Sequence, residues 1–183
     1  MIREEALKLV EEKIITRNLI KHCLAVEAVM AALAKHFQQD EIKWALAGLL
    51  HDIDYETTKD KPEQHSLLGA EMLQALNVDA EIVQAIKAHN DMHHLPRASQ
   101  IDKALFCADP TTGLIVAATL VLPSKKIADL TAENVLNRFK EKGFAKGANR
   151  EHIATCSDLD LPLEEFIKIS LGAMQRGASD LGL

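Results

Sequence analysis

Aromatic residues are scarce in this chain: five phenylalanines, one tyrosine and one tryptophan account for 4% of its 183 residues. Proteins that bind single-stranded nucleic acid use such rings as stacking platforms, so the composition argues against that class. Basic residues are also too few, because 21 lysines and arginines face 27 acidic residues and leave a formal net charge of −6. We therefore expect no nucleic-acid partner, since the bulk charge does not favour binding to phosphate backbones.

Cysteines are few, widely spaced and free of any Cys-x-x-Cys pair. Cys23, Cys107 and Cys156 are odd in number, and the first two fall within apolar helical patterns, so we interpret all three as reduced, buried thiols. Long apolar runs are absent too, and none approaches the ~20 residues that a membrane span needs. The segment 1–13 has the pattern of an acidic amphipathic helix and not of a signal peptide. These features predict a cytoplasmic protein with no membrane partner.

Alternation of apolar and polar residues with period two, which marks a half-buried strand, is missing as well. Apolar residues instead recur with helical spacing through a chain that is 48% hydrophobic and 26% charged. A chain of this length suits one domain, and no repeat or long linker divides it. We therefore predict an all-α fold, a single-domain helical bundle over residues 1–183. The expected helices are 3–13, 17–37, 40–52, 63–76, 80–89, 100–108, 112–122, 125–130, 132–142, 150–156 and 163–175.

Against this background, His51 and Asp52 follow directly on the apolar run 44–50. A buried carboxylate is costly unless a cation or hydrogen-bond donors compensate its charge. Imidazole beside carboxylate is a mixed nitrogen and oxygen donor set that suits iron, manganese, cobalt, nickel or zinc. The pair therefore indicates a metal site. The alternative for an isolated pair is that Asp52 caps the next turn and His51 is a hydrogen-bonded, half-buried histidine.

Four more potential metal ligands lie at or near the apolar faces of other expected helices. They are His22, His65, His89 and Asp109, each on a separate segment. Singly, each has a simpler explanation: a histidine on an apolar face is commonly a core residue, and Asp109 is suited to cap a helix that begins at Pro110. Together they predict one shared metal site between the central helices.

The order of these residues resembles that of the HD-domain superfamily of metal-dependent hydrolases. The text Gly-Leu-Leu-His-Asp-Ile-Asp-Tyr-Glu at 48–56 is similar to the central motif of that superfamily. The resemblance covers residues 18–118, and we expect the helices of 119–183 to complete the bundle. It implies a divalent metal, which would be manganese, iron, cobalt, nickel, zinc or magnesium. The ligands implied by the resemblance are His22, His51, Asp52 and Asp109.

Members of the superfamily with two metals carry two additional histidines between the His-Asp pair and the last aspartate. His65 and His89 stand in these places, which implies a second metal with Asp52 as the bridging ligand. The alternative is that His65 faces an open site and contacts the substrate. The cyclic-dinucleotide phosphodiesterases of the superfamily carry a paired histidine and a Gly-Tyr-Pro signature, whereas here Asn90 follows His89 and the signature is missing. The resemblance therefore does not extend to that subfamily.

The resemblance implies a metal-dependent phosphohydrolase, that is, a phosphomonoesterase or phosphodiesterase that acts on a nucleotide or other small phosphoester through metal-activated water. The residues expected to take part in catalysis are His51, Asp52, His65 and His89. Two alternatives are a mixed-valent di-iron oxygenase with the same six-ligand order and a non-catalytic nucleotide-binding helical protein. The sequence indicates neither the individual substrate nor an oligomeric state.

Residues near the predicted centre are candidates for binding the phosphate. Thr111 and Thr112 would begin a helix after Asp109, and the dipole at a helix N-terminus favours anions; the alternative is a simple helix cap. Asp54 and Glu56 are interpreted either as groups that orient the ligands or as surface acids. Cationic side chains usually form solvated faces, but some of them are candidates here. These are Lys21, Lys125, Lys126 and Arg138.

Overall fold

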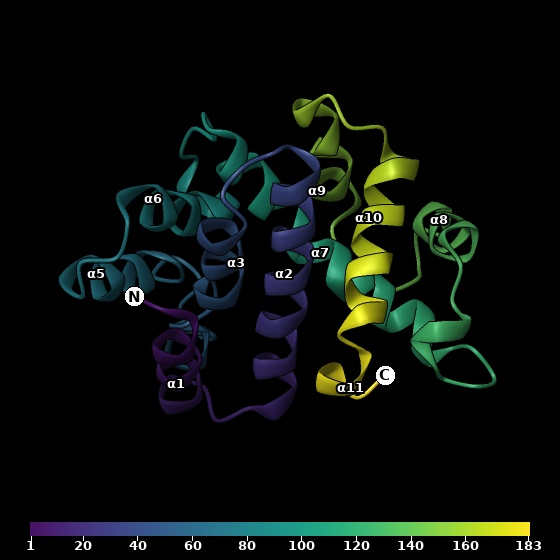
Figure 1. Cartoon of the computed structure of the whole chain (residues 1–183), viewed down its shortest axis with the longest axis horizontal. Coiled ribbons are helices and arrows are strands. Elements are labelled where there is room, and N and C mark those ends of the chain that lie inside the picture. The colour runs from purple at the N-terminus through teal and green to yellow at the C-terminus, as the bar shows by residue number, and fades with distance from the viewer.

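The computed structural model describes residues 1–183 and contains helices and connecting turns but no β-strand, which confirms the all-α prediction (Figure 1). The α-helices are α1 (Arg3–Lys13), α2 (Arg17–His36), α3 (Glu41–Leu50), α4 (Tyr55–Thr58), α5 (Leu67–Ala75), α6 (Ala80–His89), α7 (Gln100–Leu120), α8 (Ala132–Lys140), α9 (Arg150–Ala154), α10 (Leu163–Arg176) and α11 (Ala178–Leu181). Turns of 3₁₀ type lie at Asp91–His93, Ile127–Asp129 and Thr155–Leu159. None of the helices combines the length and the apolar character needed to cross a membrane.

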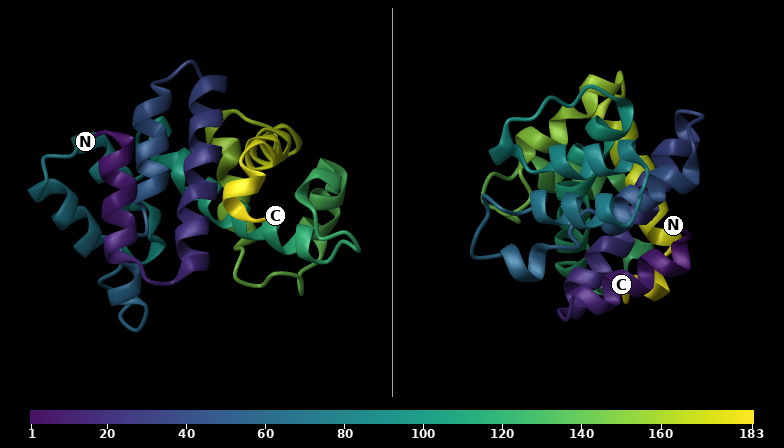
Figure 2. Two further views of the ribbon diagram at one scale, coloured as in Figure 1. Left: turned by 60° about the horizontal axis from the view of Figure 1, so that its bottom comes forward. Right: turned by 90° about the vertical axis from the view of Figure 1, so that its left-hand side faces the viewer.

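Helices α2 and α3 lie side by side, with α1 on the other side of α3 (Figure 2). Helix α2 buries one face, which includes Cys23, Val26 and Met30, at the spacing of an amphipathic helix. Helix α3 is buried throughout its last residues, 46–50. Because this buried end leads directly into His51, the local sequence carries that histidine into the interior.

The close contact between α2 and α3 depends on Gly48. A β-carbon at this position would lie 2.7 Å from the carbonyl oxygen of Val26 and 2.8 Å from the amide nitrogen of Glu27, both in the backbone of α2. Only glycine permits this approach, because it has no β-carbon. The contact also sets the distance between His22, which lies one turn before Val26, and His51, which lies one turn after Gly48.

Helix α7 packs against α2, α3 and α6, and α10 packs against both α2 and α7 (Figure 1). One hydrophobic core lies between them and includes Met30 of α2, Leu105 of α7 and Phe166 of α10, all fully buried. Helix α6 also packs against α3, and α5 packs on α6. This arrangement brings the ends of α3 and α6 to the middle of α7 and to the N-terminal half of α2.

One predicted break is absent, because α7 continues through Pro110. We expected two helices, 100–108 and 112–122, since proline removes a backbone donor and clashes with the preceding turn. Thr111 is instead buried inside the helix, and its hydroxyl donates to the carbonyl oxygen of Cys107 at 2.7 Å. The prediction that Thr111 and Thr112 begin a helix and present its dipole to an anion is therefore wrong.

Smaller differences concern the ends of elements. The helix expected over 63–76 begins only at Leu67, after turns and after Ser66, which has a positive φ of 70°. The helix expected over 125–130 is reduced to a 3₁₀ turn, and the α-helical part of the helix expected over 150–156 ends two residues early. Helices α4 and α11, of four residues each, are too short to show a period in the sequence.

Candidate metal centre

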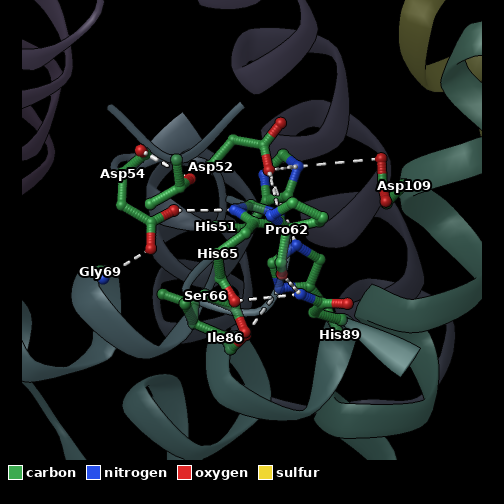
Figure 3. Close-up of polar contacts among 12 residues, drawn as sticks. His51, Asp52, Asp54, Pro62, His65, Ser66, Gly69, Ile86, His89 and Asp109 are labelled. Carbon is green, nitrogen blue, oxygen red and sulfur yellow. Dashed lines mark hydrogen bonds and ion pairs between the residues drawn. The ribbon is translucent and has the colours of Figure 1, made fainter. Parts of the chain in front are cut away.

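Six imidazole and carboxylate groups from five segments of the chain meet inside the bundle. Helix α2 supplies a histidine, the residues after α3 supply a histidine and an aspartate, the turn before α5 and the end of α6 each supply a histidine, and α7 supplies an aspartate. Five of these side chains are labelled in Figure 3 and gather around one point. The six residues are His22, His51, Asp52, His65, His89 and Asp109, the set that the sequence singles out.

His22, His51 and Asp109 form one group of three potential ligands. Nε2 of His22 lies 3.0 Å from Oδ1 of Asp109 and 3.2 Å from Nε2 of His51. Nε2 of His51 lies 3.8 Å from the same Asp109 oxygen. His51 is fully buried, whereas the Asp109 side chain is 32% exposed. Metal–ligand bonds of ~2.0–2.2 Å fit around a point between these three atoms.

Asp52 connects this group to a second one. Its Oδ2 lies 3.7 Å from Nε2 of His22, on the side of the first group. Its Oδ1 lies 3.3 Å from Nε2 of His65 and 3.6 Å from Nε2 of His89, and also 3.5 Å from Nε2 of His51. Asp52 therefore contacts histidines of both groups, as a bridging carboxylate does. His51, Asp52 and His89 form the second group of three potential ligands, and His65 lies beside it.

The two fully enclosed histidines are oriented by backbone carbonyls three residues earlier in the chain. Nδ1 of His51 lies 2.8 Å from the carbonyl oxygen of Gly48, and Nδ1 of His89 lies 2.6 Å from that of Ile86. A carbonyl oxygen only accepts, so each Nδ1 carries the hydrogen and donates it. In the neutral ring, Nε2 then has a free lone pair directed into the cluster.

His65 and His22 are oriented in the same sense by side chains. Nδ1 of His65 donates to Oδ1 of Asp54 at 2.8 Å (Figure 3). Nδ1 of His22 lies 3.1 Å from Oγ1 of Thr112, and this hydroxyl donates its own hydrogen to the Asp109 carbonyl oxygen at 2.9 Å. All four histidines therefore present the Nε2 lone pair to the same centre.

The cluster has hydrogen-bond acceptors on every side and, with neutral rings, no hydrogen to share among them. Two lone pairs that face each other at 3.2 Å, as those of His22 and His51 do, repel each other. The carboxylates of Asp52 and Asp109 add negative charge. A cation removes this conflict, because imidazole nitrogen and carboxylate oxygen both bind it. The residues present therefore fit a divalent metal, and a second group of ligands lies beside the first.

Comparison with known proteins assigns the family. Residues 19–118 match the family model of the HD domain. The chain belongs to the HD-domain family. It is similar to the ribonuclease Y of Lawsonia intracellularis, with 30% identity over 139 residues, and to that of Oleidesulfovibrio alaskensis, with 28% identity over 141 residues. Each match covers 74% of this chain but 26% of the relative, so the chain spans about a quarter of the length of these curated relatives. No solved structure matches the chain.

The electrostatics of this HD-domain centre favour positive charge. Burial lowers the pKa of His22, but the hydrogen bond to Asp109 and the charges of Asp109 and Asp52 outweigh it, and the pKa is raised. Asp52 raises the pKa of His89 in the same way, against the effect of burial. Burial prevails at His51 and lowers its pKa to about 4. Burial also raises the pKa of both carboxyl groups, yet the histidines lower it on balance. In the metal-free protein, His22 and His89 therefore take up protons more readily than a free imidazole does. A metal that binds these histidines has to displace the protons.

Two acids directly after the His-Asp pair of the HD motif have different roles. Asp54 is buried, and its Oδ2 accepts from the amide of Gly69 at 2.8 Å while Oδ1 orients His65. Glu56 is half-buried at the surface. Its carboxylate accepts from the backbone amide of Thr16 at 3.0 Å, which ties the start of α2 to α4. Of the two interpretations given to this pair, Asp54 thus fits the orienting group and Glu56 fits the surface acid.

The cationic candidates lie in different places. Lys21 lines a cavity beside the centre. Arg138 pairs with Glu141 at 2.9 Å at the end of α8, which lies on the far side of α10 from α2 (Figures 1 and 2). Lys125 and Lys126 are exposed in the turn after α7. The structure therefore places Lys21 at the cavity beside the HD-domain centre, and the other three do not line this cavity.

Two residues that position His65 were missed by the sequence interpretation. The side-chain amide of Asn90 donates to the carbonyl oxygens of Pro62 and His65 at 2.9 and 3.0 Å. Nε2 of His93 lies 2.7 Å from the same His65 oxygen. Both fasten the turn that carries His65 to the segment that follows α6. The signal in the sequence is the polar segment 89–94, which begins at a predicted ligand.

Proposed function

We propose that this protein is a metal-dependent phosphohydrolase that acts on a nucleotide or other small phosphoester. The observation that carries the proposal is the set of four imidazole nitrogens and two carboxylates that face one another and, with neutral rings, have no hydrogen between them. Membership of the HD-domain family supports the same reaction class, because the family consists generally of hydrolases.

The residues have distinct tasks in this proposal. Those that would hold one cation are His22, His51, Asp52 and Asp109; those that would hold a second are Asp52, His65 and His89. The chemistry that a bound divalent cation supplies is Lewis-acid activation of water and of a phosphoryl oxygen. Asp54 and Thr112 keep their partner histidines turned with Nε2 toward the centre. Nε2 of His65 lies 3.3 Å from Oδ1 of Asp52. If only the first cation were held, a proton on this Nε2 would be available for the leaving oxygen.

The choice of substrate rests on charge and on the extent of the similarity. The name ribonuclease Y indicates that these relatives cleave phosphodiester bonds in RNA, which makes RNA one candidate substrate. The chain spans about a quarter of those relatives, and its formal net charge of −6 provides no general attraction for a long polyanion. We therefore favour a small phosphoester and include short RNA as a competing substrate in the test.

The test combines metal analysis with a screen for phosphate release. Protein purified without chelators is analysed for bound metal. It is assayed for phosphate release from nucleotides and sugar phosphates, and for chain cleavage of short RNA, in the presence of manganese, cobalt, nickel or iron. We expect at least one equivalent of metal and hydrolysis that depends on it. Two equivalents of iron with oxygen uptake and no phosphate release would establish the oxygenase alternative. Failure to bind any divalent metal at a near-stoichiometric level would favour the non-catalytic alternative.

Two sets of variants separate the roles of the ligands. Asp52→Ala should lose metal and activity while circular dichroism shows an intact helical fold. His65→Gln combined with His89→Gln should lower the metal content from two equivalents to one and depress turnover. If the metal content holds and the Michaelis constant rises, these histidines contact the substrate instead. Wild-type metal content together with wild-type kinetics would show that both are packing residues.

A further inference from the structure

A cavity of about 420 Å³ opens beside the centre and shares His22 with it. Its volume lies within the range of about 300–1,000 Å³ that is usual for small-molecule sites. Helices α2 and α7 form two of its walls, and Leu181 and the two residues after it form a third. Leu181 ends α11, which lies beside α2 (Figure 1). Thr112, which receives the hydrogen from Nδ1 of His22, belongs to the α7 wall. The cavity therefore adjoins the ligands of the centre directly.

The side chains around this cavity are apolar, uncharged polar or cationic. Val116, Leu120 and Leu181 supply apolar surface, Asn18 supplies an amide, and no carboxylate side chain is among the lining residues. Lys21 supplies an ammonium group, and there is no arginine among the lining residues. An anionic ligand with an apolar body matches such a lining, because aliphatic walls take the body and a few polar groups fix its orientation.

The one lysine of the cavity, Lys21 of α2, contacts the third wall. Gly182 has a positive φ of 69°, and a β-carbon there would lie 2.5 Å from Nζ of Lys21. The ammonium group therefore lies against the backbone at residue 182, and Lys21 is adjacent in sequence to the ligand His22. Residue 182 also lies outside the region 19–118 that matches the HD domain. The wall formed by residues 181–183 thus comes from outside the matched region, whereas Lys21 and His22 lie within it.

We propose that the cavity binds the nucleoside of a nucleoside monophosphate whose phosphate reaches the centre. The base would lie against the aliphatic side chains of Val116, Leu120 and Leu181, and Lys21 would bind the phosphate. Sugar phosphates fit less well, because a polyol leaves these aliphatic walls without a partner. The inference rests on the proposed function and deepens it by naming the class of substrate.

Gly113 offers a direct way to fill the cavity. It lines the cavity from α7, and a β-carbon there would meet no atom within 4 Å. Gly113→Leu should therefore occupy the space of the nucleoside without disturbing the fold, since leucine favours a helix more than glycine does. Ala117→Leu, one turn further along the same wall, is an independent second variant. Gly172→Leu in α10 is the matched control, because it lies outside the cavity and its β-carbon would meet only the flexible Arg176, at 3.6 Å.

Binding is measured by calorimetry on metal-loaded protein with probes that cannot be hydrolysed. Nucleoside 5′-phosphonates carry the nucleoside and the anion, and methylphosphonate carries the anion alone. We expect at least one nucleoside phosphonate to bind wild type and Gly172→Leu at least about tenfold more tightly than methylphosphonate, a difference of about 1.4 kcal/mol. Gly113→Leu and Ala117→Leu should lose this preference while they keep their metal content and their affinity for methylphosphonate.

The outcomes separate this inference from the proposed function. Wild type without any preference for a nucleoside phosphonate, or cavity variants that keep the preference, would overturn the nucleoside site. Variants that lose both probes equally would also overturn it, because the cavity would then serve only the anion. A preference that the variants abolish, in a protein that hydrolyses no phosphoester, would uphold the nucleoside site and refute the hydrolase.

Discussion

Asp54 differs from the other groups that hold an Nδ1 atom of the centre, because it is a charged side chain buried in the fold. It accepts two hydrogen bonds of 2.8 Å, one from His65 and one from the amide of Gly69. Gly69 leaves room for it, since a β-carbon there would lie 3.2 Å from Cγ of Asp54. The negative charge strengthens donation from Nδ1. His65 therefore keeps the lone pair of Nε2 toward Asp52.

Replacing Asp54 by Asn should weaken the centre without removing a ligand. His65 and the amide of Gly69 donate to different oxygens of Asp54. In Asn one of these atoms is an NH2 group, so one of the two donors would face another donor. We expect metal affinity or turnover to fall about 10- to 100-fold, as it does for other groups that orient metal-bound histidines. Metal titration and steady-state kinetics check this. Asp60→Asn, which changes an exposed carboxylate near the same turn, is the control, and an Asp54→Asn protein that matches it would leave Asp54 without influence on the centre.

The residue types of the centre are predictable from the sequence, whereas the orientation of the rings is only partly so. His51 and His89 each follow or end a helix, and donation to the carbonyl oxygen three residues earlier is a contact within a single turn. The contact from His22 to Thr112 instead joins residues 90 positions apart, and no local pattern contains it. The expected break at Pro110 also concealed it, because that break places Thr112 at the start of a helix.

Among the elements, α7 shows how tertiary packing overrides a local rule. Proline in a helix interior costs about 3 kcal/mol or more, and the prediction of two helices follows from that cost. Leu105 and Leu114, which are buried on either side of Pro110, anchor both halves of α7 in the same core. The unbroken helix then places Asp109 and Thr112 three residues apart on one face. Both can therefore meet the same histidine of α2.

Gly48→Ala should disrupt the contact between α2 and α3. The added carbon would lie 2.7 Å from the backbone oxygen of Val26, and backbone cannot rotate away as a side chain can. We expect the free energy of unfolding to fall by about 1–3 kcal/mol. Metal affinity should fall as well, because a shift of α3 moves His51 relative to His22.

Chemical denaturation and metal titration measure these two effects. Gly172→Ala is the control, since its β-carbon would meet only the end of the Arg176 side chain, at 3.6 Å. Wild-type stability and metal affinity in Gly48→Ala would contradict the view that glycine is required where α2 and α3 meet.

For the molecule as a whole, the sequence predicts the helical class and the position of the HD domain but not the contribution of the remaining residues. The long helices each show an amphipathic period, so several segments of the sequence independently predict the all-α class. The resemblance over 18–118 agrees with the matched region 19–118. Contact between Lys21 and Gly182 depends on the packing of α10 and α11 against α2. No period or motif in either segment encodes this contact.

A bound metal should stabilise the whole molecule, because its ligands come from segments that are distant in the chain. Binding to the folded state alone, at a metal concentration of about 100 times Kd, adds about 2.7 kcal/mol. For a chain of this size that corresponds to a rise in Tm of about 5–10 °C. We expect Mn²⁺ to produce this rise in chelator-treated protein and Asp52→Ala to abolish it. Differential scanning calorimetry measures both.

The rise in Tm should also depend on pH with a definite sign. In the metal-free protein His22 and His89 have a pKa raised above 6.5, so their protonation stabilises the fold fully below about pH 6.5 and is lost as the pH rises through the raised pKa. A metal must displace these protons and therefore adds least stability in acid. His51, with a pKa of about 4, contributes no competing proton above about pH 5. We expect the rise in Tm to shrink between about pH 8 and about pH 5.5, with protons released on metal binding. A rise that stays constant or grows toward acid pH would show that His22 and His89 do not bind the metal.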